Sequence, residues 1–305
     1  MITSLDMSKK DAPHLVFRKQ PTIVSEDPFK TEKEETALAK LIAERLQKYE
    51  DRIAKELKSL TRELAEPTKL TSGWDSGDLV EEGMEYTEKG YAKGVILSSK
   101  QLDPLNVKID INMSSPGVNK TIKDLRGKLS KRVDEFGLKM QDVYEDIVYR
   151  GIESGKTFDQ IMEDVRKATG KGITEANQIA TEIIVNAARK AETETFLNVG
   201  IEIFRWITVT DSKTCETCLA LNGQVYRWND LEGAYINMDS KKFLYEELED
   251  LASEFGVEDW IVTDADGPPI HHAGECRCHF QPVMTYEQYQ DTRGSDKIKS
   301  IVSEV

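Results

Sequence analysis

An apolar residue recurs every three or four positions from Leu38 to Leu64, and this spacing dominates the first third of the chain. Such steps keep the apolar side chains on one face of an α-helix. Thr31 and Glu34 fit a capping box at its start, and Pro67 marks its end. We therefore predict one helix of about 30 residues, roughly 45 Å long, in a bundle or in a coiled-coil contact with another chain. The seam comprises Leu38, Ile42, Leu46, Tyr49, Ile53, Leu57, Leu60 and Leu64.

Helical patterns continue as far as Gly200, which is expected to end the last helix. Gly151, Gly170 and Gly172 are expected to separate helices. The segment 105–113 differs, because apolar and polar residues alternate there as in a short strand or extended segment. The further helices are predicted around 79–90 and at 118–132, 138–151, 157–168 and 174–198.

The composition changes after Gly200. Residues 201–210 are β-branched and aromatic, which predicts a strand. Asn222-Gly223 predicts a turn into a second strand at 224–228. An acidic helical insert is expected at 241–255, and a closing strand at 279–284.

The expected fold class is mainly α with a small α+β zinc-binding C-terminal domain. A long N-terminal helix and a helical bundle come first, followed by a β-hairpin and zinc-knuckle unit. An extended arm is expected to precede them, because Pro13, Pro21 and Pro28 interrupt a segment with little periodicity. The predicted divisions are an arm at 1–30, a helical domain at 31–200, the zinc-binding domain at 201–285 and a tail at 286–305.

Charge is unevenly distributed along a chain whose formal net charge is -14. Residues 201–305 hold 9 basic against 20 acidic residues, so this part should repel nucleic acid over a broad face. One basic stretch stands out at 118–132, where DNA is a candidate partner. The alternative is an ordinary solvated helix face. The candidate DNA contacts are Lys120, Lys123, Arg126, Lys128, Lys131 and Arg132.

No stretch is apolar enough to cross a membrane, and residues 1–11 lack the apolar core of a secretory signal. We therefore expect no membrane partner and a location in the cytoplasm in which the chain is made. In a reducing cytoplasm, clustered cysteines favour metal binding over disulfides.

All four cysteines occur in two tight pairs, Cys215/Cys218 and Cys276/Cys278, and His271, His272 and His279 accompany the second pair. A Cys-x-x-Cys turn directs two thiolates at one ion, and a distant second pair completes a tetrahedron. Four cysteines would satisfy one Zn²⁺. Alternatively, three cysteines bind the ion together with His272 or His271, or the cysteines are reduced and bind no metal. The zinc would be structural, one ion per chain, because protein groups would fill every coordination position.

An enzyme is not expected. Asp211, Asp264 and Asp266 with the histidines could be imagined as a metal-dependent nuclease centre, but no compact His-Asn-His-type motif or phosphate-cradling glycine loop is present. The two later aspartates are better explained as loop formers. A redox role for the Cys-x-x-Cys pair lacks the βαβ context that it would need.

The order of motifs resembles the tailed-phage head morphogenesis family related to the Mu F protein. Its pattern pairs D-x-x-x-C-x-x-C-x-x-x-x-G with a later P-x-x-H and C-R-C; the match spans roughly residues 120–285, although the histidine lies further from C-R-C than is usual in the family. The resemblance implies a minor capsid protein of the virion, located inside the phage head. It also implies association with the portal protein, with capsid or scaffolding protein as further possible partners, and a role in head assembly or genome packaging and delivery. The matching positions are Asp211, Cys215, Cys218, Gly223, Pro268, His271, Cys276, Arg277 and Cys278.

Overall fold

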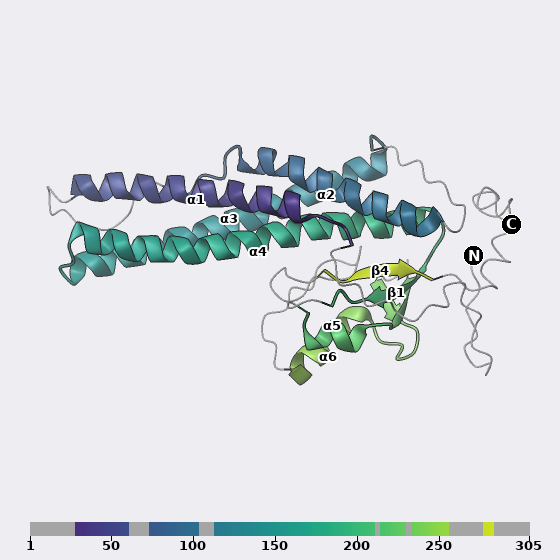
Figure 1. The fold of residues 1–305 in the computed structure, drawn as a ribbon. Helices are drawn as coiled ribbons and strands as arrows, with labels where there is room; N and C mark the ends of the chain where they lie inside the picture. The colour runs from purple at the N-terminus through teal and green to yellow at the C-terminus, as the bar shows by residue number, and fades with distance from the viewer. Residues whose placement is uncertain are drawn as a thin grey trace, which may run out of the picture. The chain divides into compact units, whose positions relative to one another are not determined.

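Six helices and four strands make up the described part of the chain, which is residues 28–60, 73–103, 113–210, 214–229, 234–255 and 277–283 of a computed structural model (Figure 1). The elements are α1 (Glu32–Leu60), α2 (Leu79–Leu102), α3 (Pro116–Glu153), α4 (Phe158–Asn198), β1 (Ile203–Ile207), α5 (Glu216–Leu221), β2 (Val225–Asn229), β3 (Ala234–Asn237), α6 (Leu244–Phe255) and β4 (His279–Pro282).

The chain forms two compact units. The helical unit contains residues 32–89 and 114–184. The mixed unit contains residues 1–31, 90–113 and 185–305, and it includes the sheet. Each of the helices α2 and α4 is divided between the two units: α2 after residue 89 and α4 after residue 184. The divisions predicted at residues 30, 200 and 285 remain predictions.

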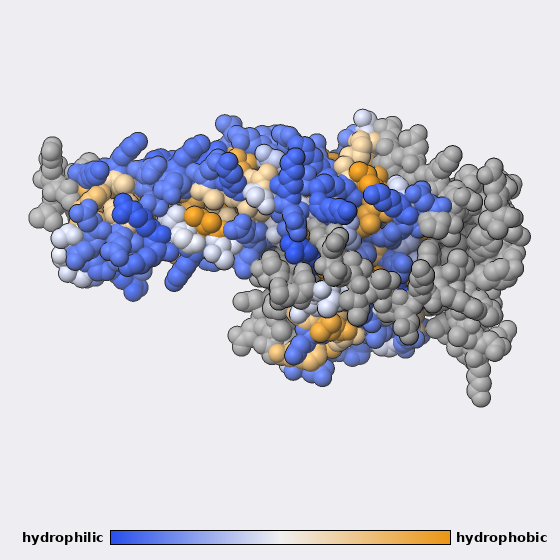
Figure 2. All heavy atoms as spheres, in the orientation of Figure 1, coloured by the Kyte–Doolittle hydropathy of each residue, from blue (hydrophilic) through white to orange (hydrophobic). Residues whose placement is uncertain are grey.

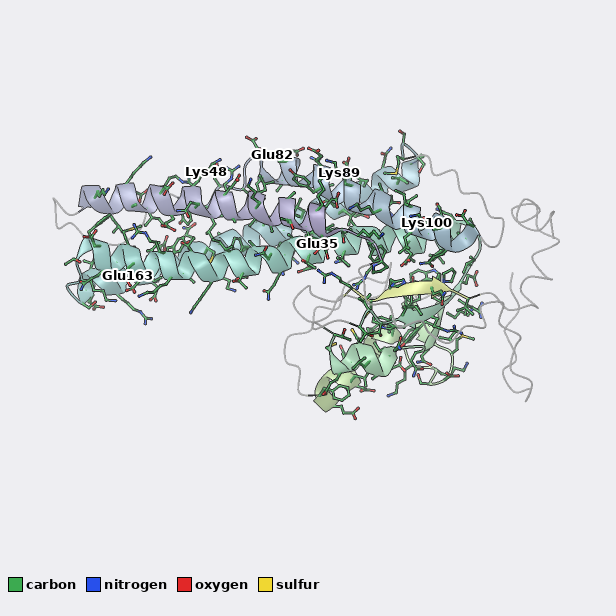
Figure 3. The ribbon with its side chains drawn as sticks, viewed as in Figure 1. Glu35, Lys48, Glu82, Lys89, Lys100 and Glu163 are labelled. Carbon is green, nitrogen blue, oxygen red and sulfur yellow. The ribbon has the colours of Figure 1, made fainter. Side chains whose placement is uncertain are left out.

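The apolar seam of α1 forms the centre of the helical unit, as predicted. Every seam residue from Leu38 to Leu57 is buried. Two hydrogen bonds align α1 with α4: Thr181 donates to Glu35 at 2.8 Å, and Thr169 donates to Glu50 at 2.7 Å. Because the numbers rise in α1 as they fall in α4, the two helices are antiparallel. Charged side chains such as those of Lys48, Glu82 and Glu163 project away from the helices (Figure 3).

Helices α3 and α4 are each continuous where two helices were predicted, and that prediction was wrong. Of the glycines expected to separate helices, Gly151 lies near the end of α3, whereas Gly170 and Gly172 lie inside α4. Gly172, and Gly137 inside α3, lie at close contacts. A Cβ added at Gly137 would lie 2.1 Å from the Trp74 indole, and one at Gly172 would lie 2.7 Å from Leu46. These glycines accept neighbouring side chains, and the gain in packing outweighs their low helix propensity.

The other helix boundaries agree better with the patterns. Helix α2 extends to Leu102, beyond the expected end near residue 90. Gly200 ends α4 with a φ of 79°, and its N–H donates to the Leu197 carbonyl. No helix in the described ranges is long and apolar enough to span a membrane.

The mixed unit contains an antiparallel sheet with strand order β3-β2-β1-β4. The expected pairing of the first two strands is confirmed, with Phe204 opposite Tyr226. The closing strand is also confirmed as β4, which pairs Trp206 of β1 with Phe280. Strand β3, four residues long between β2 and α6, was not predicted from the sequence. The acidic insert folds as α6, as predicted.

Several predictions concern residues outside the described ranges. They include the arm up to residue 27, most of the predicted strand at 105–113, and the tail at 286–305. Met113 alone of that strand is described, and it lies in a turn.

Candidate functional site

The Cys-x-x-Cys motif forms the start of α5, directly after the central strand β1. Cys215 is the N-cap of this short helix, and its Sγ accepts a hydrogen bond from the Cys218 backbone N–H at 3.4 Å. Cys215 is half-buried and Cys218 is buried. A Cys at this position satisfies an otherwise unpaired N–H, as Ser or Asp does at other helix starts. The predicted turn is therefore present, and both cysteines lie at the start of α5.

Three further hydrogen bonds attach this turn to the end of β1. The Thr208 hydroxyl donates to the Cys218 carbonyl at 2.6 Å, and the Thr208 N–H donates to the Asn222 side chain at 3.1 Å. The Gly223 N–H donates to the Trp206 carbonyl, and Gly223 has a φ of 86° that favours glycine. The predicted Asn-Gly turn is thus confirmed, and it fixes the backbone that carries the cysteines.

The second cysteine pair is represented by Cys278, which is buried immediately before β4. Cys278 and Cys218 belong to one hydrophobic cluster that also contains Phe280, and Cys215 packs against this cluster. His279 faces elsewhere: its ring meets the ring of Phe29 edge to face at 6.0 Å. Successive residues of a strand point to opposite faces. His279 is therefore not directed at the cysteines.

The zinc centre itself remains a prediction. Among the residues that the structure describes, no group of three or more His, Cys, Asp or Glu side chains is arranged to hold a metal ion. Cys276, His271 and His272 lie outside those residues. The described cysteines fit the prediction in one respect: Cys218 and Cys278 belong to one buried cluster, and Cys215 packs against it.

A buried polar group that the sequence analysis missed lies at the edge strand β4. Glu192 of α4 is fully buried and accepts hydrogen bonds from the Phe280 backbone N–H and from the Gln101 side chain at 3.1 Å. Burial raises the pKa of Glu192 well above its ordinary value, while burial and then Arg189 lower the pKa of His279 to about 3. Glu192 thus covers a backbone donor that an open strand edge would expose. The sequence predicts that Glu192 lies in a helix rich in Ala and Glu, but it does not predict that Glu192 is buried.

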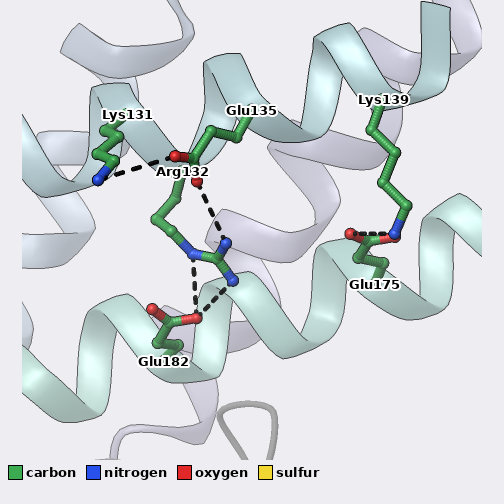
Figure 4. A network of polar contacts seen from close by, with 6 residues as sticks. All are labelled: Lys131, Arg132, Glu135, Lys139, Glu175 and Glu182. Carbon is green, nitrogen blue, oxygen red and sulfur yellow. Dashed lines mark hydrogen bonds and ion pairs between the residues drawn. The ribbon is translucent and has the colours of Figure 1, made fainter. Parts of the chain in front are cut away.

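The basic stretch lies on the N-terminal half of α3, and much of it is engaged in ion pairs. Arg126 binds Glu81, and Lys131 approaches Glu135 at 3.9 Å. Arg132 binds Glu182 at 2.8 Å and Glu135 at 3.5 Å (Figure 4). The remaining candidates include Lys120 and Lys123, which are exposed near the start of the helix.

The described chain is mainly helical and has one small antiparallel sheet. The Cys-x-x-Cys motif lies in the connection between strands β1 and β2 of this sheet. Residues 142–281 match the family model described as phage Mu protein F like protein. This segment runs from the second half of α3 to β4 and includes both cysteine pairs. The match confirms the resemblance to phage head morphogenesis proteins, and it indicates a phage head-related protein. No curated protein and no solved structure showed significant similarity.

Proposed function

We propose that this protein is a structural minor head protein of a tailed phage. It would associate with the portal inside the procapsid and aid head assembly or genome packaging and delivery. The match of residues 142–281 to the phage Mu protein F like family is the observation that carries this proposal. Long, mostly polar-faced helices support it, because they offer extended side surfaces for other head components (Figure 2).

Co-sedimentation tests the portal association. The protein is expected to co-sediment with portal oligomers of its own phage and to be present in mature heads. Procapsids assembled without portal serve as the control and should contain much less of it. Equal amounts in both kinds of procapsid would contradict the association with portal.

We further propose that one structural zinc ion holds the small sheet of the mixed unit together. The first pair, Cys215 and Cys218, would supply two thiolates from the start of α5. Cys276 and Cys278 would complete the site, with His272 or His271 as the alternative for one cysteine. The zinc would act as a crosslink between the turn after β1 and the start of β4, because its ligands come from both.

Metal content tests the zinc proposal. Purified protein should contain about one zinc per chain, and Cys215→Ser and Cys276→Ser should each lose it. The variants His271→Ala and His272→Ala separate the two ligand sets: both retain zinc if four cysteines bind it, and one of them loses it if a histidine takes part. Metal-free wild-type protein that folds normally would contradict the proposal.

A second candidate function is contact with packaged DNA through the start of α3. Lys120 and Lys123 are exposed there, one turn of the helix apart. Arg126, Lys131 and Arg132 are poorer candidates, because they bind glutamates of the same chain. Each lysine that contacts a phosphate releases about one counterion, so binding should weaken with salt.

The double variant Lys120→Glu and Lys123→Glu tests this second candidate without breaking the ion pairs of Figure 4. Affinity for duplex DNA should fall at least about tenfold, and the salt dependence should become shallower. Lys40→Glu is the matched control, since Lys40 is an exposed lysine of α1 outside the stretch. Equal affinity of the double variant and the control would remove α3 from consideration.

A further inference from the structure

Strand β4 follows directly after one cysteine of the proposed zinc site, and it lies at an edge of the sheet. This cysteine, Cys278, is buried. Strand β4 is four residues long and stands last in the order β3-β2-β1-β4, so β1 is its one neighbour in the sheet. An edge strand has hydrogen bonds to the sheet on one side, so contacts on its other side help to decide how firmly it is held. The position of Cys278 therefore depends on what contacts β4 from outside the sheet.

The backbone N–H of Phe280 points away from β1, toward the outer edge of the sheet. Val283 donates its N–H to the Ile203 carbonyl at 2.8 Å, and hydrogen-bonded pairs alternate with non-bonded pairs along antiparallel strands. Phe280 lies opposite Trp206 and three positions before Val283, so its N–H and C=O face outward. Pro282 is the other residue of β4 that faces outward, and proline has no N–H. Phe280 thus supplies the one outward backbone donor of β4.

Glu192 of α4 accepts the hydrogen bond from this outward donor. Its side chain is fully buried, and it also accepts a hydrogen bond at 3.1 Å from the side-chain amide of Gln101 on α2. Burial raises the pKa of Glu192, and the neighbouring Arg189 opposes this effect by stabilising the carboxylate. A buried carboxylate is costly unless hydrogen bonds satisfy it, so these contacts hold Glu192 in one place. The parts of α2 and α4 that belong to the mixed unit therefore fix the group that contacts β4.

The ring of Phe280 links this contact to the cysteines. Phe280 belongs to the same hydrophobic cluster as Cys218 and Cys278, and its ring centroid lies 5.4 Å from that of Phe204. The core of the mixed unit thus holds the ring, while Glu192 holds the backbone N–H. Both constraints act two residues after Cys278, and metal ligands need positions that are fixed to within about 0.5 Å. A shift of β4 away from β1 would carry the Cys278 sulfur with it.

We propose that Glu192 is a positioning residue for the zinc centre: it fixes the backbone of β4 at Phe280 and thereby sets the position of Cys278 toward the ion. Glu192 has this role only if the zinc centre proposed above is present. The role goes beyond that centre, because Glu192 lies on a helix outside both cysteine pairs and is not one of the proposed ligands. Loss of its hydrogen bond to Phe280 weakens zinc binding although every ligand remains.

The zinc affinity of full-length variants tests this role. Glu192→Ala removes the acceptor and should lower the affinity for zinc about tenfold, as changes in outer groups that orient metal ligands do. Glu192→Gln should restore the affinity, because an amide oxygen still accepts from the Phe280 N–H and the new amide group can donate to the Gln101 Oε1. That oxygen is buried and has no partner among the described residues. Competition with a chromogenic chelator measures the affinities.

Glu182→Ala is the matched control. Glu182 is another buried glutamate of α4, but it binds Arg132 of α3 and belongs to the helical unit. Its removal should lower stability and leave the zinc affinity unchanged. Cobalt in place of zinc adds a readout that stability alone does not change, because its ligand-field spectrum reports the coordination geometry. Glu192→Ala should alter this spectrum, whereas Glu192→Gln and Glu182→Ala should retain that of the wild type.

Amide hydrogen exchange at Phe280 separates failure of this role from failure of the zinc centre. Glu192→Ala should speed exchange of the Phe280 N–H about tenfold, with or without metal, because its hydrogen bond is lost. Equal exchange in wild type and Glu192→Ala, or faster exchange with unaltered zinc affinity and cobalt spectrum, would overturn the role of Glu192 alone. Zinc affinity as low in Glu192→Gln as in Glu192→Ala would overturn it as well. Wild-type protein that binds no zinc would overturn the zinc centre and this role together.

Discussion

Two adjacent cations on α3 differ sharply in how much of their ion pair is shielded from water. Arg132 is 33% exposed and binds Glu182, whose side chain is only 6% exposed. Lys131 is 75% exposed and lies 3.9 Å from Glu135, which is itself half exposed. An ion pair contributes little at the surface, whereas removal of one partner from a buried pair leaves an uncompensated charge.

Arg132→Ala is therefore expected to lower the free energy of unfolding by about 2 kcal/mol, less than for a fully buried pair because Arg132 is partly exposed. Lys131→Ala should leave it nearly unchanged. Urea unfolding followed by circular dichroism measures both. The double variant Arg132→Ala and Glu182→Gln removes the charge that Arg132→Ala alone leaves unpaired on Glu182. If the double variant is as unstable as Arg132→Ala alone, this unpaired carboxylate is not the cause of the destabilisation.

The cysteines show how far residue-level reasoning reaches. Their spacing alone predicted a turn, and Cys215 at the start of α5 confirms it. Glu192 was not identified, because nothing in its sequence neighbourhood marks it as buried against the backbone of Phe280. A ligand motif is local in sequence, whereas a carboxylate that caps a strand edge depends on a contact across 88 positions.

At the scale of elements, helices α2 and α4 are in backbone contact in the mixed unit. A Cβ added at Gly94 would lie 1.9 Å from the Ala188 carbonyl oxygen, so the backbones touch there. Gly94 is buried, and Ser98 one turn later is buried as well. Small residues on this face of α2 allow the contact.

Gly94→Ala is expected to lower the free energy of unfolding by about 2–3 kcal/mol, because the helices must separate to admit a methyl group. Gly127→Ala on α3 is the matched control, since nothing lies within 4 Å of the added Cβ. It should raise stability by about 0.5–1 kcal/mol through better helix propensity. Thermal unfolding of both variants distinguishes a packing effect from a propensity effect, and destabilisation by both would contradict this explanation.

At the scale of the whole molecule, both units bury tyrosines, and folding makes these tyrosines harder to ionise. Burial raises the pKa of Tyr49 and Tyr144, in the helical unit, to about 12. Burial, with Glu194 and Glu247 respectively, also raises the pKa of Tyr91 and Tyr226 in the mixed unit. These phenols are neutral when protonated, and the unfolded chain releases their protons near pH 10.

The contribution of these tyrosines to stability is therefore expected to be constant below about pH 10 and to fall as the pH rises toward 12. Urea unfolding between pH 8 and pH 12, with absorbance at 295 nm to follow phenolate formation, measures the loss. Tyr49→Phe should reduce it without breaking a hydrogen bond, because within the described residues the Tyr49 hydroxyl has no partner. A Tyr49→Phe variant with an unaltered alkaline loss would show that this tyrosine does not contribute.

The sequence by itself determined the mainly helical class, the apolar face of α1, the end of α4 at Gly200 and the Asn222-Gly223 turn. Each depends on residues within one or two helical turns of one another, so local spacing suffices. Only the tertiary structure decided that Gly137 and Gly172 continue helices. It also decided that Arg132 binds within the chain, and that Glu192 covers the edge of β4. Those outcomes depend on Trp74, Leu46, Glu182 and the backbone of Phe280, which folding brings close from distant parts of the chain.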